Sequence, residues 1–454
     1  MKYINKDKGF YGEMISIALP ITLQNLIASS VNMLDTLMIT SLGQESLAAV
    51  GLANQVFFFY AVTIFGVATG SSVFISQFWG KKDIKNIRKI IGLSLTISGI
   101  IGVIFTLGGL LIPDRIMMIF SKDIEVIELG SEYLRIVAFS YIITGFSSTY
   151  AIASRSIGQA KMPMVVSLVS FVSNGVLNYL FIFGKLGFPA LGIKGAAYGT
   201  LIARLIEIVL ILYSIYSDDG PLAGNLKEMT QWNKDFAKRY FNTAYPVIIS
   251  EALWSLGTVF YSIAYAKIGT EATAAVQILN TVQNVFMVMT RGLANACTVM
   301  VGSRIGAGEE DLAIDYANRF LRLSVVLGLG LGGILYFGSD VILKVFRNLT
   351  PELYATSKKS LTVLSLFFFI KVFNATMMVG VFRGGGDTKF SMLLEMGAVW
   401  FVGVPLAFLG ATVFKLPLHQ VLVLVYMDEA VTAIVGLPRI VSKKWVKNVI
   451  QDMG

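Results

Sequence analysis

The residue whose type and position could most clearly do chemistry is Asp35, an acid inside a long apolar stretch from about residue 14 to residue 40. A carboxyl group away from water favours its protonated form, whereas a bound cation favours the ionised form. Asp35 could therefore hold either a proton or Na⁺ and exchange one for the other. The alternative is a carboxylate near the outer end of a membrane helix that reaches interfacial water.

Neutral polar side chains could complete a ligand set around this acid. One helical face beside Asp35 carries Asn25, Ser29, Asn32 and Thr36. A second face, on the apolar stretch from 163 to 183, carries Ser167, Ser170, Asn174 and Asn178. Hard cations prefer several oxygen ligands, so these groups could surround an ion held by Asp35. They could instead serve only as hydrogen-bonding contacts between packed helices.

A second candidate is Glu251, which follows Pro246 early in the apolar stretch from 241 to 266. An acid at membrane depth is costly and is a functional candidate by default. Glu251 could bind a proton or a cation, or it could attract a positively charged substrate. The remaining charges in apolar stretches include Arg204 with Glu207, which we expect to neutralise each other, and a set without a clear role: Lys371, Glu395, Asp428 and Glu429.

A polar face on the stretch from 272 to 302 predicts the lining of a cleft. This face carries Gln277, Asn280, Asn284, Met287, Arg291 and Asn295. Lipid would not tolerate such a surface, so we expect it to line a cleft together with Asn25, Asn32 and Asn54. The helix that carries Asn54 is otherwise more apolar, and a cleft of this mixed character suits flat, greasy molecules.

The composition identifies the kind of protein in which these residues lie. Hydrophobic residues make up 55% of the 454 residues, charged residues only 14%, and the mean hydropathy is +0.71. Soluble proteins carry about 25% charged residues, so this chain is predicted to be an all-α polytopic membrane protein. Twelve apolar stretches are long enough to span a bilayer: 14–40, 46–78, 90–112, 133–153, 163–183, 195–216, 241–266, 272–302, 320–338, 360–382, 391–414 and 418–438.

Enzymatic functions lack their usual residues. One histidine and one cysteine exclude histidine-based metal sites, Ser-His catalysis and an internal disulfide. The run Gly384–Asp387 matches the Gly-x-Gly-Asp string of intramembrane aspartyl proteases, but it lies in a short basic loop. The phosphate-binding motif Gly-x₄-Gly-Lys-Ser/Thr is missing, so ATP cannot drive transport directly. We therefore expect no enzyme and no cofactor, and transport that depends on an ion gradient.

The basic residues predict orientation and not nucleic-acid binding. The net charge is +9, but most Lys and Arg residues fall at the ends of apolar stretches, as in membrane proteins. Their bias towards alternate loops predicts a protein of the cytoplasmic membrane with both termini in the cytoplasm. The first apolar stretch is too long for the core of a signal peptide, so we expect it to remain in the mature protein.

An internal repeat organises the chain. At an offset of 226 residues Pro20 matches Pro246, Asn54 matches Asn280 and Gly80 matches Gly306, and at 228 Arg155 matches Arg383. This predicts two pseudo-symmetric six-helix lobes, related by an axis along the membrane normal, with a cleft between them. The predicted lobes are residues 1–216 and 239–454, joined by a cytoplasmic linker at 217–238 that includes Asp218 and Asp219.

Several motifs in order resemble those of the multidrug and toxic compound extrusion (MATE) family. They are Pro20 with Asp35, the run Leu42–Val50 with its second copy Ile268–Val276, the run Gly187–Ala197, and Arg383–Lys389. The resemblance covers nearly the whole chain. It implies twelve helices in two lobes around a V-shaped central cleft, and entry of Na⁺ or H⁺ coupled to the export of organic cations.

The resemblance also implies roles for particular residues. Asp35 matches the family's coupling aspartate, Asn174 and Thr200 match its hydrogen-bonding partners, and Glu251 resembles an acid that some branches carry. Asn178 departs from the family, because several members have an aspartate there. Asn374 departs as well, because one branch has a cation-binding aspartate in that helix. Either Na⁺ or a single proton would suit the remaining charge.

Together these observations predict a secondary antiporter that exports amphipathic, often cationic compounds by alternating access. Asp35, with Asn174, Asn178 and Thr200, would take up Na⁺ or H⁺ and thereby weaken substrate binding. We expect small organic substrates, a lipid bilayer as the surroundings, no nucleic-acid partner and a monomer. The alternative is a lipid-linked oligosaccharide flippase of related architecture, which would need a more basic cleft to hold pyrophosphate.

Overall fold

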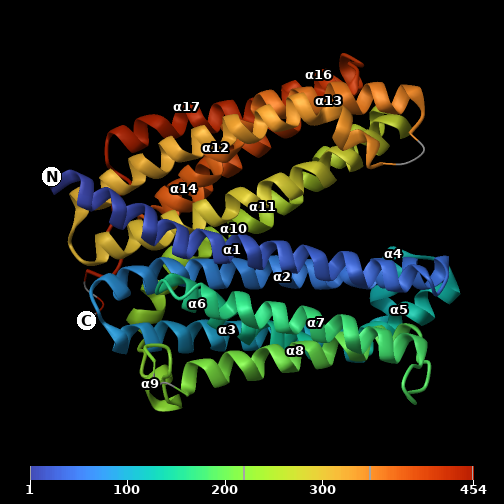
Figure 1. Ribbon diagram of the computed structural model, residues 1–454, viewed down its shortest axis with the longest axis horizontal. Helices are drawn as coiled ribbons and strands as arrows, with labels where there is room; N and C mark the ends of the chain where they lie inside the picture. The colour runs from blue at the N-terminus through green and yellow to red at the C-terminus, as the bar shows by residue number, and fades with distance from the viewer. Residues whose placement is uncertain (1, 218–219, 347–348, 452, 454) are drawn as a thin grey trace. The chain divides into compact units, whose positions relative to one another are not determined.

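The computed structural model describes residues 2–217, 220–346, 349–451 and 453. Within these ranges the chain forms helices joined by short turns (Figure 1). The predicted acids Asp218 and Asp219 of the linker lie outside the described residues. In the described part of the chain, eleven helices are long and apolar enough to cross a membrane, and a bent pair supplies a twelfth span, so the predicted all-α polytopic fold is confirmed.

The chain divides into two compact units, which we call the N-unit and the C-unit. The N-unit comprises residues 19–244 with Met453, and the C-unit comprises residues 2–18 and 245–451. Two helices contribute to both units, namely α1 (Lys2–Thr40) and α10 (Lys234–Ile268). The chain thus changes unit inside a helix each time, whereas the predicted lobes end between helices.

The two changes of unit occur at equivalent points of the repeat. The boundaries fall after Ala18 and after Ala244, so they are 226 residues apart, and Pro20 and Pro246 lie just beyond them. A proline inside a helix removes one backbone hydrogen bond and favours a bend. The repeat therefore includes the point at which each first helix passes from one unit into the other.

Each of these helix beginnings is fixed by aromatic packing in the unit to which it belongs. In the C-unit, Phe10 is fully buried and packs edge-to-face on Tyr316 and Phe320. In the N-unit, the ring of Tyr240 stacks on Phe74 and its hydroxyl lies 2.8 Å from Ser71 Oγ. Buried aromatic side chains contribute large apolar areas, so these contacts are enough to assign the segments to their units.

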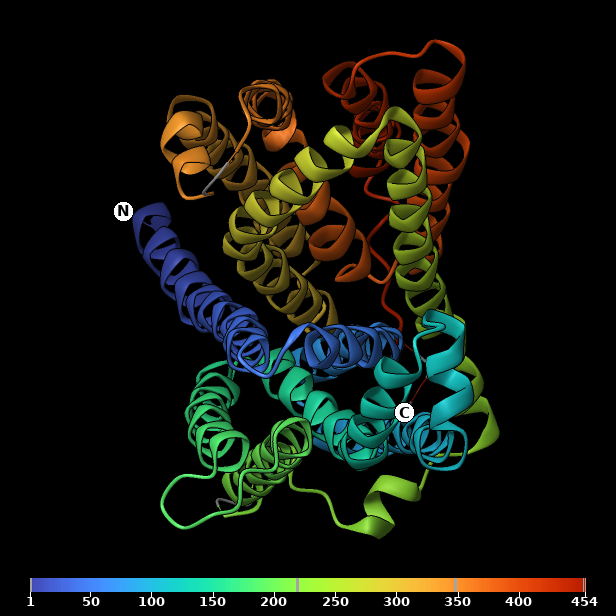
Figure 2. The same ribbon diagram turned by 90° about the vertical axis from the view of Figure 1, so that its right-hand side faces the viewer.

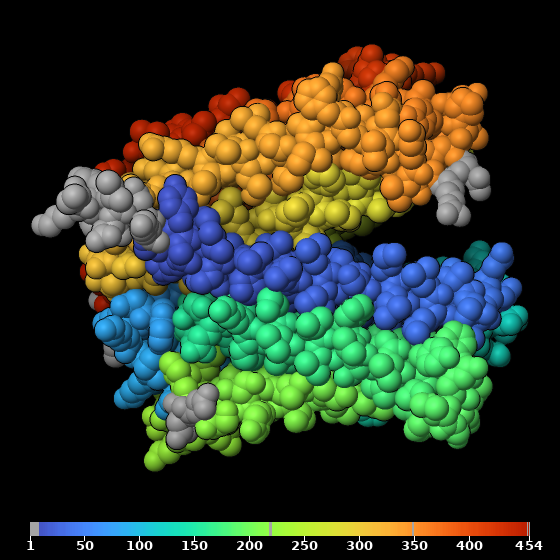
Figure 3. Space-filling model, in the orientation of Figure 1, coloured from blue at the N-terminus to red at the C-terminus, as the bar shows by residue number. Residues whose placement is uncertain are grey.

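The N-unit is a bundle of long helices with short connections. After α1 it contains α2 (Gln44–Gly80), α3 (Ile84–Leu111), α4 (Pro113–Phe120), α5 (Ile124–Val137), α6 (Phe139–Ser156), α7 (Lys161–Phe183), α8 (Ile193–Tyr216) and the short α9 (Leu226–Thr230). Helices α7 and α8 lie side by side on the outside of this unit (Figure 3). The core contains Tyr60 and Tyr141, which stack with 5.0 Å between ring centroids.

The predicted span 133–153 is not one straight helix. Helices α5 and α6 meet at Ala138 with a bend of 48°. The carbonyl of Ala138 accepts a hydrogen bond from Thr106 Oγ1 of α3 at 2.8 Å. A side chain that bonds a helix carbonyl competes with the regular ladder and bends the helix, which explains the break without a proline.

The C-unit repeats the bundle but interrupts it with π-helical turns. After α10 it contains α11 (Thr270–Gly306), α12 (Glu310–Lys344), α13 (Pro351–Ala375), η1 (Thr376–Arg383), α14 (Thr388–Ala398), η2 (Val399–Gly403), α15 (Val404–Phe408), η3 (Leu409–Val413), α16 (Leu418–Val425) and α17 (Met427–Val441). Helices α12 and α13 pack closely together, as the second view shows (Figure 2). The core is apolar and includes Leu364 and Phe368.

A π-turn adds a residue to a helix, and this affects the register of the repeat. Burial in the sixth helix of each unit matches best at an offset of 229. The buried positions are Ala203, Glu207 and Ile211 in α8, and Thr432, Gly436 and Ile440 in α17. The offset thus grows from 226 in the first helices to 229 in the last. Equivalent sites of the two units can therefore be compared residue by residue.

The outer surfaces carry large apolar side chains. Phe337 is 85% exposed and Phe401 is 83% exposed, and similar residues occur on most of the spanning helices. Soluble monomers rarely expose apolar patches of this extent. These surfaces fit the hydrocarbon region of a bilayer, in agreement with the predicted spans.

Candidate functional site

The N-unit brings Asp35 of α1 against α7. Asn178 Nδ2 donates a hydrogen bond to Asp35 Oδ1 at 2.6 Å and lies 3.4 Å from Asn174 Oδ1. Asn174 and Asn178 are one helical turn apart and are 3% and 0% exposed. The predicted polar face of α7 thus reaches Asp35 through its last two members.

The other two members of that face have different partners. Ser170 Oγ donates to the carbonyl of Ala203 at 3.2 Å, and Ser167 Oγ accepts from Gln24 Nε2 at 2.8 Å. These bonds join α7 to α8 and to α1. The alternative interpretation of these residues, as packing contacts between helices, therefore describes the two serines.

A glycine allows the close approach at Asp35. A Cβ atom at Gly199 of α8 would collide with Oδ1 of Asn178, the same side chain that donates to Asp35. Thr200 follows this glycine and interacts with the buried Tyr133. The structure thus places Thr200 on the adjoining helix beside the site, while the donor to the carboxylate is Asn178.

The charges around Asp35 do not cancel. Arg204 of α8 is close enough to interact electrostatically with Asp35, but its Nη1 donates to Glu207 Oε2 at 2.7 Å. The predicted mutual neutralisation of Arg204 and Glu207 therefore agrees with the structure. With all three groups ionised, one negative charge is left over, and burial makes such a charge costly. A single proton or monovalent cation would balance it.

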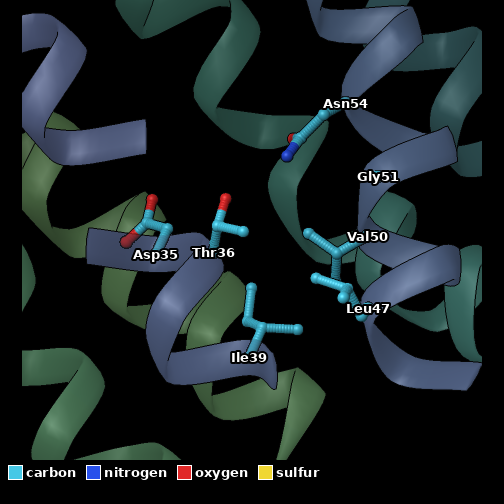
Figure 4. Close-up of a pocket in the computed structure, with 7 residues that line it drawn as sticks. All are labelled: Asp35, Thr36, Ile39, Leu47, Val50, Gly51 and Asn54. Carbon is cyan, nitrogen blue, oxygen red and sulfur yellow. The ribbon is translucent and has the colours of Figure 1, made fainter. Parts of the chain in front are cut away.

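A small pocket adjoins this acid. It has a volume of about 230 Å³ and is lined by Asp35, Thr36 and Ile39 from α1 and by Leu47, Val50, Gly51 and Asn54 from α2 (Figure 4). Pockets for drug-sized ligands are larger, from about 300 Å³ upwards, whereas one water occupies about 30 Å³. The pocket can hold an ion with a few waters beside Asp35, and Asn54 supplies a polar group on the opposite wall.

The C-unit holds Glu251 in a different environment. Arg383, whose side chain is only 5% exposed, lies 2.5 Å from Glu251 Oε1 and 3.2 Å from Glu395 Oε2. Ser250 Oγ donates a hydrogen bond to the same Glu395 oxygen. Glu251 was predicted from the sequence as an ion site, without Arg383 as its partner. In this structure Glu251 and Glu395 are two half-buried acids that share the buried base Arg383.

A second charged cluster in the C-unit joins three spans. Lys371 Nζ lies 2.9 Å from Glu429 Oε1, and Asn374 Nδ2 donates to Glu429 Oε2 at 2.7 Å. Tyr261 of α10 donates its hydroxyl proton to Asp428 Oδ2 at 2.7 Å. We call these five residues the Lys371 cluster. Lys371, Asp428 and Glu429 were noted from the sequence without a role. The repeat could have indicated this cluster, because it places Tyr261 at the position equivalent to Asp35.

The predicted cleft residues have mixed surroundings. On α11, Gln277, Asn280, Asn284 and Arg291 are exposed, while Met287 packs against the apolar core of the C-unit. On the N-unit, Asn32 and Asn54 are exposed and Asn25 is half-buried. The exposed polar faces are compatible with the predicted lining, while the assignment of these residues to a substrate cleft stays a prediction.

The fold and these buried charges define a polytopic helical membrane protein built from a duplicated six-helix unit. The model of the MatE family matches the chain in two segments, residues 20–180 and 246–409. The chain therefore belongs to the MatE family, and its identification from the motifs is confirmed. It is a multi-pass membrane transporter and not an enzyme.

Curated relatives match along nearly the whole chain. "Probable multidrug resistance protein NorM" of Thermotoga maritima is 25% identical over 441 residues, which cover 96% of this chain and 94% of the relative. "Probable multidrug resistance protein YoeA" of Bacillus subtilis is 26% identical and covers 87% of this chain and 86% of its own length.

Solved structures share the fold. A MATE crystal structure in the bent conformation superimposes with a TM-score of 0.87 at 22% identity, covering 96% of this chain and 97% of its own. A transporter of the MOP superfamily from Pyrococcus furiosus gives a TM-score of 0.85 at 22% identity and covers 96% of each chain. At this level of identity the likeness extends to the architecture and not to the sites.

Proposed function

We propose that this transporter is a secondary antiporter that exports amphipathic, often cationic organic compounds in exchange for Na⁺ or H⁺. The observation that carries the proposal is the bond from Asn178 to Asp35 beside a pocket of ionic size. Asp35 is the proposed coupling residue, supported by Asn174, Asn178 and Thr200.

The exchange at Asp35 follows from its charge balance. The uncompensated negative charge favours uptake of one proton or one Na⁺, and both cannot be held by one carboxylate at once. The neutral oxygens of Asn174 and Asn178 could complete the coordination of Na⁺, while a proton would need only Asp35. Asn178 Oδ1 is buried without a hydrogen-bond partner among the described residues, so an unused acceptor is present at the site.

Neutralising Asp35 would also change the forces on α1. The ionised carboxylate accepts a charge-assisted hydrogen bond from Asn178, which is stronger than a bond to a neutral group. Protonation weakens this bond and loosens the outer part of α1 from α7. Pro20 provides the point at which the helix can bend in response. Ion binding would in this way be coupled to a conformational change that lowers substrate affinity.

The substrate class rests on the relatives and on the exposed polar and aromatic faces. Both curated relatives carry multidrug resistance in their names. Arg291 is the one charged residue on the exposed polar face formed by Gln277, Asn280, Asn284 and Arg291 of α11, and a single positive charge is little to hold a pyrophosphate-linked lipid. The lipid-linked oligosaccharide flippase therefore stays the less favoured alternative. We also propose a monomer in the cytoplasmic membrane with both termini in the cytoplasm.

The test is efflux of a fluorescent organic cation from proteoliposomes, with Na⁺ and pH gradients imposed separately. We expect one gradient to drive dye movement in the wild type and Asp35→Asn to abolish the coupling. The matched control is Asp311→Asn, because Asp311 is an exposed acid in the first turn of α12. Movement under neither gradient would contradict antiport, and full coupling in Asp35→Asn would contradict the assignment of the site.

A further inference from the structure

The Lys371 cluster contains more acid than base. Asp428 and Glu429 of α17 face a single ammonium group, that of Lys371 on α13, so one negative charge is uncompensated when all three are ionised. The side chains of Lys371 and Glu429 are only 14% and 22% exposed. An uncompensated charge in such surroundings is strongly unfavourable, because burial removes the water that would stabilise it. A neutral state with one additional positive charge is therefore favoured.

The two acids are held in different ways. Both oxygens of Glu429 have donors, since Lys371 Nζ and Asn374 Nδ2 each bond one of them. Asp428 Oδ2 accepts from Tyr261, whereas Asp428 Oδ1 is buried without a hydrogen-bond partner among the described residues. The uncompensated charge is thus on Asp428 and not on Glu429.

A second, independent feature points to a missing positive group at this place. The side chain of Asn374 is 3% exposed, and its Oδ1 has no hydrogen-bond partner within the described part of the chain. Its Nδ2 is committed to Glu429, which fixes the direction of the amide. Two buried acceptor oxygens in one cluster, on Asn374 and Asp428, both lack a donor. Buried acceptors are nearly always satisfied, so a further partner is expected here.

The cluster favours a proton over a metal ion as that partner. The ammonium of Lys371 already lies where a cation would neutralise Glu429, and it would repel a second cation held in the same dry space. A proton needs no extra room and converts the unpartnered oxygen of Asp428 into a donor.

Among the described residues, the titratable side chains that interact with Asp428 come from α10, α13, α17 and the turn before α17. Helix α10 contributes Tyr261 and Tyr265, α13 contributes Lys371, the turn before α17 contributes Tyr426, and α17 itself contributes Glu429. The Lys371 ammonium lies 4.5 Å from the ring centroid of Tyr426, so a cation-π contact also holds it in place.

We propose that the Lys371 cluster is a second ion-binding site, selective for a proton, in which Asp428 carries the proton and Lys371 is a tethered counter-ion for Glu429. This goes beyond the proposed coupling at Asp35 and does not depend on it, because the two sites lie in different units. In this cluster the ammonium group of Lys371 takes the place of a bound cation at Glu429.

The test is infrared difference spectroscopy of the purified full chain in lipid nanodiscs, following the carbonyl stretch of protonated carboxyl groups during a pH titration. We expect Asp428→Asn to lose the intensity of one protonated carboxyl group relative to wild type, and Asp35→Asn to retain that group. Adding Na⁺ in place of choline should leave the Asp428 signal unchanged. Asp311→Asn serves as the control for an exposed acid.

Two further variants keep the test decisive if Asp428→Asn folds poorly. Tyr261→Phe removes the donor that favours ionised Asp428, so the proton should leave at a higher pH. Lys371→Met removes the counter-ion, so one more protonated carboxyl group should appear, from Glu429. A signal in Asp428→Asn equal to that of wild type would overturn the proposal. Displacement of the proton by Na⁺ would also overturn it, because the cluster would then be a sodium site.

Discussion

The two units use the same framework but place their acids on opposite helices. In the N-unit the first helix carries Asp35, while the sixth helix carries Gly199 and Thr200 beside it. In the C-unit the position equivalent to Asp35, at an offset of 226, is Tyr261, and at an offset of 229 the sixth helix carries Asp428 and Glu429. The acid of the N-unit site is thus on the first helix, whereas the acids of the equivalent C-unit site are on the sixth helix.

A second pair of equivalent sites also differs in the placement of acids. In the N-unit, Arg155 donates to Gln24 Oε1, and Gln24 donates to Ser167. At the repeat offsets, Arg383 is equivalent to Arg155 and Glu395 is equivalent to Ser167. Ser250 is equivalent to Gln24, and both Ser250 and its neighbour Glu251 take part in the C-unit site. The arginine is kept, but its partners are neutral in one unit and acidic in the other. Duplication thus preserved the geometry, while the charge of each site changed independently.

The largest effect is expected from removing the two equivalent arginines. Arg383→Met removes the base that bridges the half-buried Glu251 and Glu395, which should cost about 3 to 5 kcal/mol of stability. Arg155→Met leaves only neutral partners without a donor and should cost about 1 to 3 kcal/mol. Thermal unfolding of the detergent-purified variants measures the difference.

A rescue variant checks the cause of this difference. Combining Arg383→Met with Glu251→Gln and Glu395→Gln should recover most of the lost stability, because no buried charge is then unpaired. Equal destabilisation by Arg155→Met and Arg383→Met would contradict the difference in charge between the two sites.

A smaller effect is expected from two glycines that make room for the donors of the acids. A Cβ atom at Gly199 would collide with Asn178, and one at Gly403 would collide with the hydroxyl of Tyr261. Gly199→Ala should therefore displace the donor to Asp35 and reduce ion-coupled dye efflux by about tenfold, the loss that corresponds to about 1.4 kcal/mol. Gly403→Ala should instead displace the donor to Asp428.

The matched control for both variants is Gly397→Ala, because no atom lies within 4 Å of a Cβ built there. We expect this variant to transport like the wild type. The comparison between the units would be weakened if Gly199→Ala and Gly397→Ala behaved alike, since the close approach at Asn178 would then have no functional consequence.

The smallest effect concerns the segments that follow the sixth helix of each unit. After α8, Glu228 of α9 pairs with Arg88 at 3.0 Å, and hydrogen bonding to the backbone of Asn225, with the nearby Arg88, holds the pKa of Glu228 below its usual value. After α17, the buried Asp387 binds Arg439 at 2.8 Å and Lys447 at 2.6 Å. The Arg88–Glu228 pair is half-buried, whereas the second set of ion pairs is anchored on the buried Asp387.

The Arg88–Glu228 pair predicts a response to acid. Because the pKa of Glu228 is lowered on folding, its contribution is complete above the ordinary carboxyl value of about 4.3 and is lost as the pH falls through the lower folded value. We expect Glu228→Gln to make the segment 220–233 slightly more susceptible to limited proteolysis at neutral pH, and to remove the acid dependence seen in wild type. Unchanged acid dependence in Glu228→Gln would assign the response to other groups.

Much of the architecture follows from patterns along the chain. The spans, the duplication and the polar face of α7 were predicted from periodicity and offset, because each helix must expose apolar side chains to lipid and keep polar ones on one side. Asp35 was recognised for the same reason, as an acid inside an apolar stretch. The bend at Ala138 was not predictable, because it depends on a hydrogen bond from Thr106 on another helix.

The sequence by itself determined the twelve spans, the two related halves and the presence of acids at membrane depth. Only the tertiary structure decided which of those acids are paired. Arg383 reaches Glu251 across 132 residues, and Tyr261 reaches Asp428 across 167. Periodicity reports which face of a helix is polar, but it carries no information about which distant helix supplies the partner. The charge balance of a buried site depends on that partner, and so it is fixed only when the helices pack.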